Sequence, residues 1–351
     1  MNYLEDKINT TSERKKDHID LCLNESVVFN NKTNGFDKYH FDHFAATEID
    51  YNEIDLSSKF FGKKITYPFL ISCMTGGTDE ANAINANLAV IANEIGIPIG
   101  VGSQRQALEN SSFHKSYKVI RQNAKSVPVL GNIGAAQISE LNHNDSIKFL
   151  IDLVEADAMV IHLNAAQEVV QEKGEPNFKG LLKKINKLTK EISIPLIVKE
   201  VGAGINKKSA KLLLDNGIRG IDVAGAGGTS WTAVEFKRNN SPNENELWNW
   251  GLPTTYCIKE VNKLKKKYYF TLIASGGITN GFEIAKALIL GADITASARP
   301  ILISVVNNGI EKTINEIHYM FENVKKVMYL NGASNIKELK KCRLIKTEDI
   351  Y

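Results

Sequence analysis

Eight short apolar runs rich in β-branched residues recur along this 351-residue chain, and each one ends in a small, polar or glycine-rich signature. Helical patterns separate most of the runs, an alternation that is typical of a parallel sheet buried on both faces. Such a chain predicts an α/β fold, a (β/α)8 TIM barrel, which builds its active site from the carboxyl ends of its strands. In chain order the signatures are Met74-Thr75-Gly76-Gly77, Gly102-Ser103-Gln104-Arg105, Gly131-Asn132-Ile133-Gly134, His162-Leu163-Asn164, Lys199-Glu200, Ala224 to Thr229, Ser275-Gly276-Gly277-Ile278, and Ala296 to Pro300.

The same alternation predicts where the barrel elements lie. The expected strands are Tyr67–Cys73, Pro98–Val101, Val127–Leu130, Ala158–His162, Pro195–Lys199, Gly220–Val223, Thr271–Ala274 and Ile294–Ser297. The expected helices are 79–94, 113–123, 145–155, 178–191, 207–216, 281–290 and 310–330. Gly217 and Gly291 each stand between a helix and the next strand, where a left-handed C-cap is needed.

Three parts follow from these positions. Residues 1–66 lack the rhythm and form an N-terminal extension with one expected helix, 67–334 form the barrel, and 335–351 form a charged tail. Residues 224–252 make a loop after strand six that is too long for an ordinary connection and so indicates function. The alternative fold is an open doubly wound sheet, but that fold usually carries G-x-G-x-x-G after its first strand, where this chain has Met74-Thr75-Gly76-Gly77.

The net charge, the cysteines and the apolar runs limit which classes of partner and which cellular location we expect. A net charge of +3 is too small to indicate nucleic acid. The four cysteines form no C-x-x-C pair, which disfavours zinc and redox motifs and suits a reducing cytosol. The first 20 residues lack the apolar core of a signal peptide, and no apolar run approaches the roughly 20 residues needed to span a bilayer. We therefore expect a cytoplasmic protein with neither nucleic acid nor membrane as a partner.

Two signatures at the end of the barrel predict a phosphate site. Ser275-Gly276-Gly277-Ile278 follows strand seven, and Ala298-Arg299-Pro300 follows strand eight. TIM barrels commonly hold a phosphate group with the loops after these two strands. Glycines let backbone N–H groups approach the anion, and Arg299 adds a positive charge.

A lysine ends the fifth apolar run. Lys199 follows 194–198, and a lysine inside a barrel mouth is costly unless an anion or a partner meets it. It is suited either to form a Schiff base or to stabilise negative charge on a ring. The residues by themselves leave both roles open.

Polar and basic groups around other strand ends indicate a metal and a diphosphate. The segment from His162 to Glu168 offers donors, acceptors and one carboxylate, and a single Glu168 can ligate Mg²⁺ together with phosphate oxygens and waters. Arg14-Lys15-Lys16-Asp17-His18 and Arg105 supply basic groups. One arginine can donate two parallel hydrogen bonds to the oxygens of a phosphate group, so these basic groups suit a diphosphate.

Together these motifs resemble the type 2, FMN-dependent isopentenyl-diphosphate delta-isomerases. The resemblance runs in order from residue 14 to residue 300, and Arg14-Lys15-x-x-His18 and His162-Leu163-Asn164-x-x-Gln167-Glu168 are its most particular parts. It implies an isomerase of isoprenoid biosynthesis that interconverts isopentenyl and dimethylallyl diphosphates with reduced FMN and Mg²⁺. It also implies NADPH as the usual reductant and a homo-oligomer, a tetramer or an octamer.

The resemblance assigns roles by position. It implies FMN contacts at Cys73, Met74, Thr75, Ser103, Asn132, Lys199, Thr229, Gly276, Gly277, Ile278, Ala298 and Arg299. It implies substrate contacts at Arg14, Lys15, His18, Ser103, Gln104, Arg105 and Gln167, and Mg²⁺ ligation by Glu168. It implies catalytic roles for His162, Asn164 and Gln167.

The implied chemistry agrees with the residues. Moving a double bond adds a proton at one carbon and removes one at another, and no ordinary pair of side chains here is an obvious acid and base for both steps. A reduced flavin can supply a ring nitrogen for this purpose without net redox change, and Lys199 beside the ring would favour its anionic form. The expected intermediate is a tertiary carbocation stabilised electrostatically by the electron-rich flavin and the diphosphate.

Two other classes are compatible with parts of the pattern. Flavin-dependent 2-hydroxy-acid oxidases are also barrels with paired phosphate loops, but they usually place a histidine base in Ser-Asn-His-Gly after strand six. This chain has Ala224-Gly225-Ala226-Gly227-Gly228 there, without a histidine. A non-catalytic flavin- or phosphate-binding protein is the third interpretation, and the Gln167-Glu168 pair argues against it because binding alone needs no metal.

Overall fold

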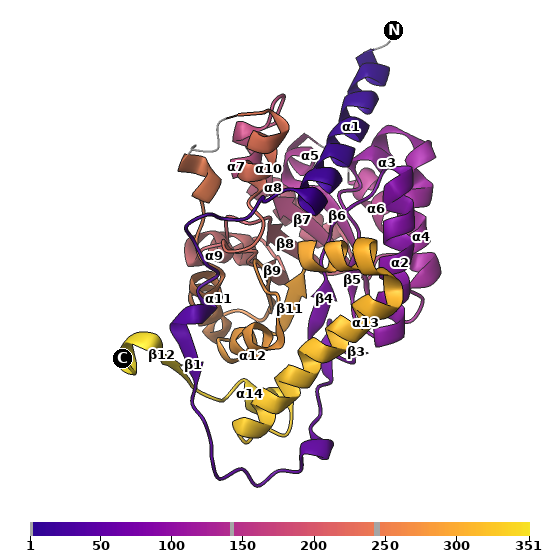
Figure 1. Ribbon diagram of the computed structural model, residues 1–351. Coiled ribbons are helices and arrows are strands. Elements are labelled where there is room, and N and C mark those ends of the chain that lie inside the picture. The colour runs from indigo at the N-terminus through magenta and orange to yellow at the C-terminus, as the bar shows by residue number, and fades with distance from the viewer. Residues whose placement is uncertain (1–2, 141–143, 242–245) are drawn as a thin grey trace.

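The computed structural model describes residues 3–140, 144–241 and 246–351 (Figure 1). Eight parallel strands close into a barrel in the order β10-β11-β4-β5-β6-β7-β8-β9, which confirms the predicted TIM barrel. The strands are β4 (Phe69–Ile71), β5 (Ile99–Gly100), β6 (Val129–Gly134), β7 (Ala158–Leu163), β8 (Leu196–Glu200), β9 (Gly220–Asp222), β10 (Thr271–Ala274) and β11 (Ile294–Ser297).

The strands lie where the sequence pattern predicts them. Some strand ends differ from the predicted ends, because pairing with the neighbouring strand determines where a strand stops. β10 and β11 have the predicted bounds. β6 begins later than predicted and runs on to Gly134, because Leu130 to Gly134 pair in register with Ala158 to His162 of β7. This pairing overrides the weak strand preference of the two glycines in β6.

Helices surround the barrel. The outer helices are α2 (Asp79–Ile95), α4 (Lys115–Asn123), α6 (Asp145–Leu153), α8 (Leu181–Glu191), α9 (Lys207–Asp215), α11 (Thr254–Asn262), α12 (Gly281–Ile289) and α13 (Arg299–Leu330). Gly217 and Gly291 have φ values of 91° and 116°, the positive range that their places after α9 and α12 require. The helix predicted over 310–330 is the second part of α13, which begins at Arg299 and bends at Gly309, where φ is 80°.

Short elements lie in the connections of the barrel and in the N- and C-terminal segments. They are α3 (Arg105–Glu109), α5 (Ala135–Glu140), α7 (Ala165–Val170), α10 (Trp231–Arg238), α14 (Ile336–Leu339), and the 3-10 turns η1 (Phe36–Lys38), η2 (Tyr51–Glu53), η3 (Ser111–His114), η4 (Glu246–Asn249), η5 (Lys263–Lys266) and η6 (Thr347–Asp349). The segment 224–252, predicted as a loop, thus contains the helix α10 and the turn η4, and its residues 242–245 lie outside the described part.

The N-terminal extension and the tail join each other. Helix α1 (Tyr3–Asn24) leads into a chain that carries β1 (Tyr39–Phe41), which pairs antiparallel with β12 (Leu344–Lys346) of the tail, at the lower left of Figure 1. The hairpin of β2 (Ser58–Phe60) and β3 (Lys63–Ile65) contributes Phe60 and Ile65 to the core inside the barrel. Among the described residues, no helix combines the length and apolar character needed to cross a membrane.

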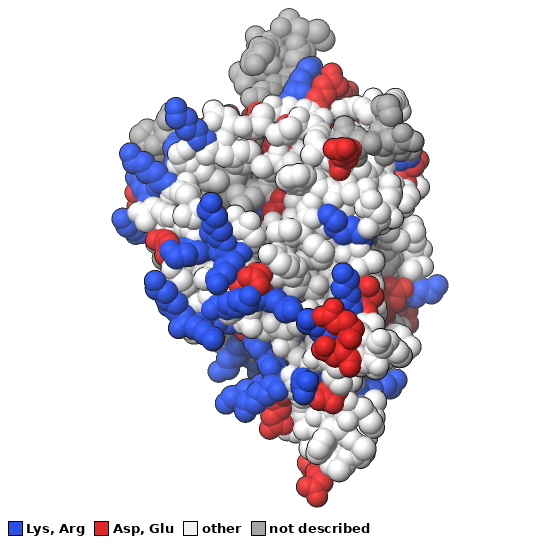
Figure 2. Space-filling model, turned by 90° about the vertical axis from the view of Figure 1, so that its left-hand side faces the viewer, with Lys and Arg blue, Asp and Glu red and all other residues white. Residues whose placement is uncertain are grey.

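One face of the molecule is strongly basic. Figure 2 shows lysines and arginines spread over the side that lies on the left in Figure 1, where α9 and α11 are labelled. Lys207, Lys208 and Lys211 belong to α9, and Lys259 belongs to α11. The excess is local, because the whole chain carries only +3, and none of these lysines lines the cavity described below.

Candidate functional site

A cavity of about 360 Å³ lies at the carboxyl ends of the barrel strands, as the fold predicts. Its lining includes every residue predicted to bind FMN, Mg²⁺ or substrate except Gln104. Helix α1 contributes Arg14, Lys15 and His18, and the segment after β9 contributes Thr229 and other small residues. The strand ends and the N-terminal extension therefore share one site.

Gln104 is placed differently from the prediction. Its side chain is fully buried and does not line the cavity. The amide nitrogen donates to Leu150 O at 2.9 Å, and the amide oxygen accepts from Asn132 N at 2.9 Å. Gln104 therefore supports the backbone of Asn132, and we do not retain it as a direct substrate contact.

Glycines pack the two loops after β9 and β10 backbone to backbone on one side of the cavity. A Cβ on Gly228 would lie 2.5 Å from Gly277 N, and a Cβ on Gly276 would lie 2.1 Å from Gly225 O. No side chain fits at these positions, so peptide groups themselves form this wall. Helix α13 begins beside it at Arg299, and a helix N-terminus attracts anions. This wall fits the phosphate group of FMN.

Arg299 also ties the extension to the barrel. Its guanidinium donates to Cys22 O at 2.7 Å and to Glu25 O at 3.0 Å, at the end of α1. Carbonyls at a helix C-terminus attract a cation, so this contact fixes the end of α1 over the cavity. The charge predicted for phosphate binding is thus shared with a structural contact.

Lys199 lies among acceptors at the end of β8. Its Nζ donates to Glu200 O at 3.0 Å and to Ser275 Oγ at 3.4 Å, and it lies 3.3 Å from Oδ2 of Asp222. An ammonium group held by a carboxylate stabilises charge and is no free amine nucleophile. Of the two roles that the sequence left open, we therefore favour stabilisation of negative charge on a ring.

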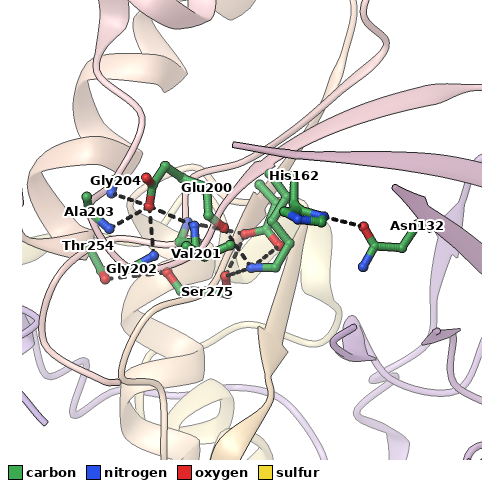
Figure 3. Close-up of polar contacts among 12 residues, drawn as sticks. Asn132, His162, Glu200, Val201, Gly202, Ala203, Gly204, Thr254 and Ser275 are labelled. Carbon is green, nitrogen blue, oxygen red and sulfur yellow. Dashed lines mark hydrogen bonds and ion pairs between the residues drawn. The ribbon is translucent and has the colours of Figure 1, made fainter. Parts of the chain in front are cut away.

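The loop after Lys199 is held by one buried carboxylate. Oε2 of Glu200 accepts hydrogen bonds from the backbone N–H groups of Val201, Gly202, Ala203 and Gly204, at 2.7, 2.7, 2.5 and 3.3 Å (Figure 3). Burial raises the pKa of Glu200 even though these hydrogen bonds oppose the rise. The contacts fix Val201 and Gly202 in the cavity wall.

His162 has a defined hydrogen-bond partner. Asn132 Nδ2 donates to Val101 O at 3.1 Å, so its Oδ1, 2.9 Å from His162 Nδ1, acts as the acceptor (Figure 3). Burial, with the nearby charges of Lys199 and Lys15, lowers the pKa of His162 to about 4. The imidazole is therefore neutral near pH 7, with its proton on Nδ1 and Nε2 left as an acceptor.

Glu168, the predicted Mg²⁺ ligand, lies on α7 (Ala165–Val170), and Asn164 precedes this helix as its N-cap residue. Asn164 Nδ2 donates to Glu168 Oε1 at 2.8 Å, and the backbone N–H of Glu175 donates to Glu168 Oε2 at 2.7 Å. Among the described residues, Oδ1 of Asn164 is buried without a hydrogen-bond partner. No group of three or more His, Cys, Asp or Glu side chains in the described ranges is placed to hold a metal. Oxygen donors around one carboxylate fit a Mg²⁺ ion that substrate phosphates and waters complete.

Lys15 extends from α1 to the part of the cavity wall that follows β4 and β5. Its Nζ donates to Gly76 O at 2.7 Å, to Ser103 O at 3.1 Å and to Tyr117 Oη at 3.0 Å. Burial, and then the neighbouring charge of Arg14, lowers the pKa of Lys15 to about 7. An anion bound here would favour the charged form of this amine.

Arg105 is already engaged by carboxylates. Its two Nη atoms each lie 2.8 Å from an oxygen of Glu175, and Nε lies 3.0 Å from Glu109. A diphosphate that binds Arg105 must share it with Glu175 or displace it. The prediction of a substrate contact at Arg105 stays a prediction.

Comparison with known proteins shows the family of this chain. The FMN-dependent dehydrogenase family model matches residues 126–346. An isopentenyl-diphosphate delta-isomerase of Chlorobium phaeobacteroides is 42% identical, over 96% of each chain. One of Chlorobium limicola is 44% identical over 96% of each chain, and one of a Nostoc species is 42% identical over 94% of each. The chain belongs to the isopentenyl-diphosphate delta-isomerase family.

Solved structures support the fold of this family member. A putative lactate oxidase of Pediococcus acidilactici is similar with a TM-score of 0.70 at 16% identity, over 99% of this chain and 95% of that one. A flavocytochrome b2 variant with sulfite bound is similar with a TM-score of 0.72 at 17% identity, over 99% of this chain and 87% of that one. At these identities the likeness concerns the fold alone.

Sequence reasoning missed a buried carboxylate that contacts several residues of the cavity lining. Glu235 of α10 is fully buried, and its Oε1 accepts from Gln167 Nε2 at 2.8 Å and contacts His18 Nε2 at 2.9 Å. The Gln171 amide satisfies its neighbours best with its nitrogen 3.0 Å from Glu235 Oε1 and its oxygen 2.9 Å from Arg14 Nη1. A lone acidic residue inside the apolar run of α10 was the available signal.

Proposed function

We propose that this protein interconverts isopentenyl and dimethylallyl diphosphates, with reduced FMN and Mg²⁺, and that NADPH supplies the reducing electrons. The observation that supports this most directly is a cavity with two anion-binding sides. Gly276, Gly277 and Arg299 follow β10 and β11, whereas Lys15 lies against the ends of β4 and β5 and Arg105 follows β5. In the closed strand order β4 is next to β11, whereas β5, which Arg105 follows, lies across the barrel from β9, and β7, which Glu168 follows, lies across from β11. One side suits the phosphate of FMN, and the other suits a diphosphate.

The residues expected around the cofactor would bind it largely through backbone groups. The glycine wall and the N-terminus of α13 would hold the phosphate, and Cys73, Met74 and Thr75 would border the ring. Reduced FMN supplies, when bound, a ring nitrogen that can give and take a proton beside the substrate. Burial raises the pKa of the Cys73 thiol to about 12, so Cys73 stays protonated and unreactive.

The substrate side would combine one carboxylate with several cations. Glu168 would hold Mg²⁺ against the diphosphate, and Arg14, Lys15 and Arg105 would neutralise the remaining charge. His162, neutral with Nε2 as an acceptor, orients a donor group and does not serve as a strong acid near pH 7. Gln167, Asn164 and His18 would border the hydrocarbon part of the substrate.

The oxidase alternative lacks its base in this cavity. The segment from Ala224 to Gly228 contributes Ala224, Gly225, Gly227 and Gly228 to the lining that the structure describes, without a histidine. Of the two histidines in the lining that the structure describes, His18 contacts the carboxylate of Glu235, and burial lowers the pKa of His162 to about 4. A base that removes a substrate proton works best with a pKa near the operating pH, so the site supports the isomerase better.

The decisive assay is anaerobic. The protein is mixed with isopentenyl diphosphate, FMN and Mg²⁺ in D₂O, with and without NADPH, and dimethylallyl diphosphate is followed by NMR. We expect deuterium-labelled product when the flavin is reduced, with NADPH consumed only to reduce the flavin. Consumption of NADPH in proportion to product would contradict the proton-transfer role. If the protein binds FMN and turns yellow but forms no dimethylallyl diphosphate, the proposed isomerase activity is contradicted and the proposed FMN binding stands.

A further inference from the structure

A buried carboxylate stands directly behind the cationic residue of the proposed flavin site. Asp222 ends β9 and pairs in register with Lys199 of β8. It is 1% exposed and, unlike Lys199, it does not line the cavity. Its position places a negative charge between the barrel core and the lysine that the site presents.

The contacts of Asp222 are divided between its two oxygens. Oδ1 accepts from Ser275 Oγ at 2.6 Å and from the backbone N–H of Ala224 at 3.3 Å. Oδ2 lies 3.3 Å from Lys199 Nζ and has no hydrogen bond of good geometry among the described residues. The ion pair with Lys199 is thus the principal compensation for the charge on Oδ2.

The pair is screened little by solvent. The side chains of Lys199 and Asp222 are 12% and 2% exposed. Charges in such a place interact through an effective dielectric far below that of water. The electrostatic influence of both charges extends to Cys73 in the cavity wall. Burial raises the pKa of the Cys73 thiol to about 12, and of the two charges Lys199 lowers this pKa and Asp222 raises it.

We propose that Asp222 is a positioning residue that sets, through Lys199, how strongly this site prefers reduced over oxidised FMN. The inference rests on the proposed binding of FMN beside Lys199. An anionic reduced ring gains more from a lysine than a neutral oxidised ring does, and the carboxylate behind the lysine offsets part of that gain. Removing the carboxylate charge therefore favours the reduced ring.

The test compares the affinities of oxidised and reduced FMN in the holoprotein, by anaerobic titration and by equilibration with a reference dye. Asp222→Asn keeps the shape and removes the charge. We expect the preference for reduced FMN to rise about tenfold, which for a two-electron couple is about 30 mV. Asp215→Asn is the matched control, because Asp215 pairs with Lys211 on exposed α9 and its charge change should leave the ratio unaltered.

A second variant keeps the test valid if Asp222→Asn does not fold. Ser275→Ala removes both the hydrogen bond to Oδ1 and the 3.4 Å contact of Ser275 Oγ with Lys199 Nζ, while the carboxylate keeps its charge. Asp222 then offsets Lys199 more strongly, so the preference should move the opposite way, toward oxidised FMN, by about threefold. Opposite shifts in the two variants would support the proposal. An unchanged ratio in both, or a shift of Asp222→Asn toward oxidised FMN, would overturn it.

This test is separable from the proposed activity. FMN binding without isomerase activity would overturn the proposed function and leave the affinity ratios as a valid test of Asp222. Failure of the unchanged protein to bind FMN would overturn both.

Discussion

His18 Nε2 lies 2.9 Å from Oε1 of Glu235, a contact between residues 217 positions apart in the chain. Arg238 Nη1 lies 2.6 Å from the other oxygen of the same carboxylate. Burial by itself raises the pKa of Glu235, but the hydrogen bonds from His18 and Gln167 and the charge of Arg238 lower it overall. The ionised carboxylate therefore fastens α1 to α10 and aligns Gln167 at the cavity.

Glu235→Gln should loosen α1. The change removes the charge that holds His18 and Arg238, and breaking a buried charged contact costs several kcal/mol. We expect proteolysis within α1 to accelerate and KM to rise about tenfold. Glu25→Gln is the matched control, because Glu25 also joins α1 to α10, through Lys237 at 3.5 Å, but at an exposed position worth about 0–1 kcal/mol. Equal effects of the two changes would contradict this role.

Lys15 should make substrate capture pH-dependent. Its pKa of about 7 in the folded protein lies below the ordinary 10.5, so the amine loses its proton as pH rises through about 7. We expect kcat/KM to fall above that pH, because the free enzyme loses a charge that the diphosphate needs. In Lys15→Arg the charge persists, so this alkaline fall should disappear. An identical pH profile in the variant would rule out Lys15 as its source.

The same lowered pKa has a consequence for stability. Between about pH 7 and 10.5 the unfolded chain holds a proton on Lys15 that the folded protein does not. The contribution of Lys15 to the free energy of unfolding therefore rises with pH across this window and is flat below it. Thermal melts from pH 7 to 9 should show a smaller rise in Lys15→Met than in the unchanged protein.

Glu168→Gln should separate metal from flavin. The change removes the carboxylate proposed to hold Mg²⁺ but leaves the glycine wall untouched. We expect activity to fall at least about 100-fold, with a weaker response to added Mg²⁺ and unaltered FMN binding. Glu172→Gln, at an exposed position nearby, should behave as the unchanged protein does. Loss of FMN from Glu168→Gln would show that its position is misassigned.

Gly228→Ala should abolish the cofactor site by steric overlap. The new Cβ would lie 2.5 Å from Gly277 N, so two backbone segments must separate. We expect FMN affinity to fall by about 100-fold or more, measured by fluorescence titration. Gly62→Ala supplies the control, because its Cβ meets nothing within 4 Å and only the positive φ of 85° is strained there. Normal FMN binding by Gly228→Ala would contradict the proposed cradle.

The strand–helix rhythm was sufficient to predict the barrel and the meeting of the strand-end signatures at one cavity. Residues such as Lys199 and Arg299 follow strand ends, and parallel strands bring all such ends to one mouth. Side-chain direction is what this pattern did not predict. Gln104 stands between two predicted substrate residues, Ser103 and Arg105, yet its amide turns inward to Leu150 and Asn132. Position along the chain did not reveal that direction.

The sequence by itself determined the barrel, the glycine-rich loops and the identity of the groups at the mouth, because apolar periodicity and glycine placement are local properties. Only the tertiary structure decided which charges meet. Glu235 reaches His18, Asp222 reaches Lys199 and Glu175 reaches Arg105 through contacts between distant segments. Burial then sets the pKa of Lys15 and His162. Such pairings depend on distance and desolvation, which arise when the chain closes.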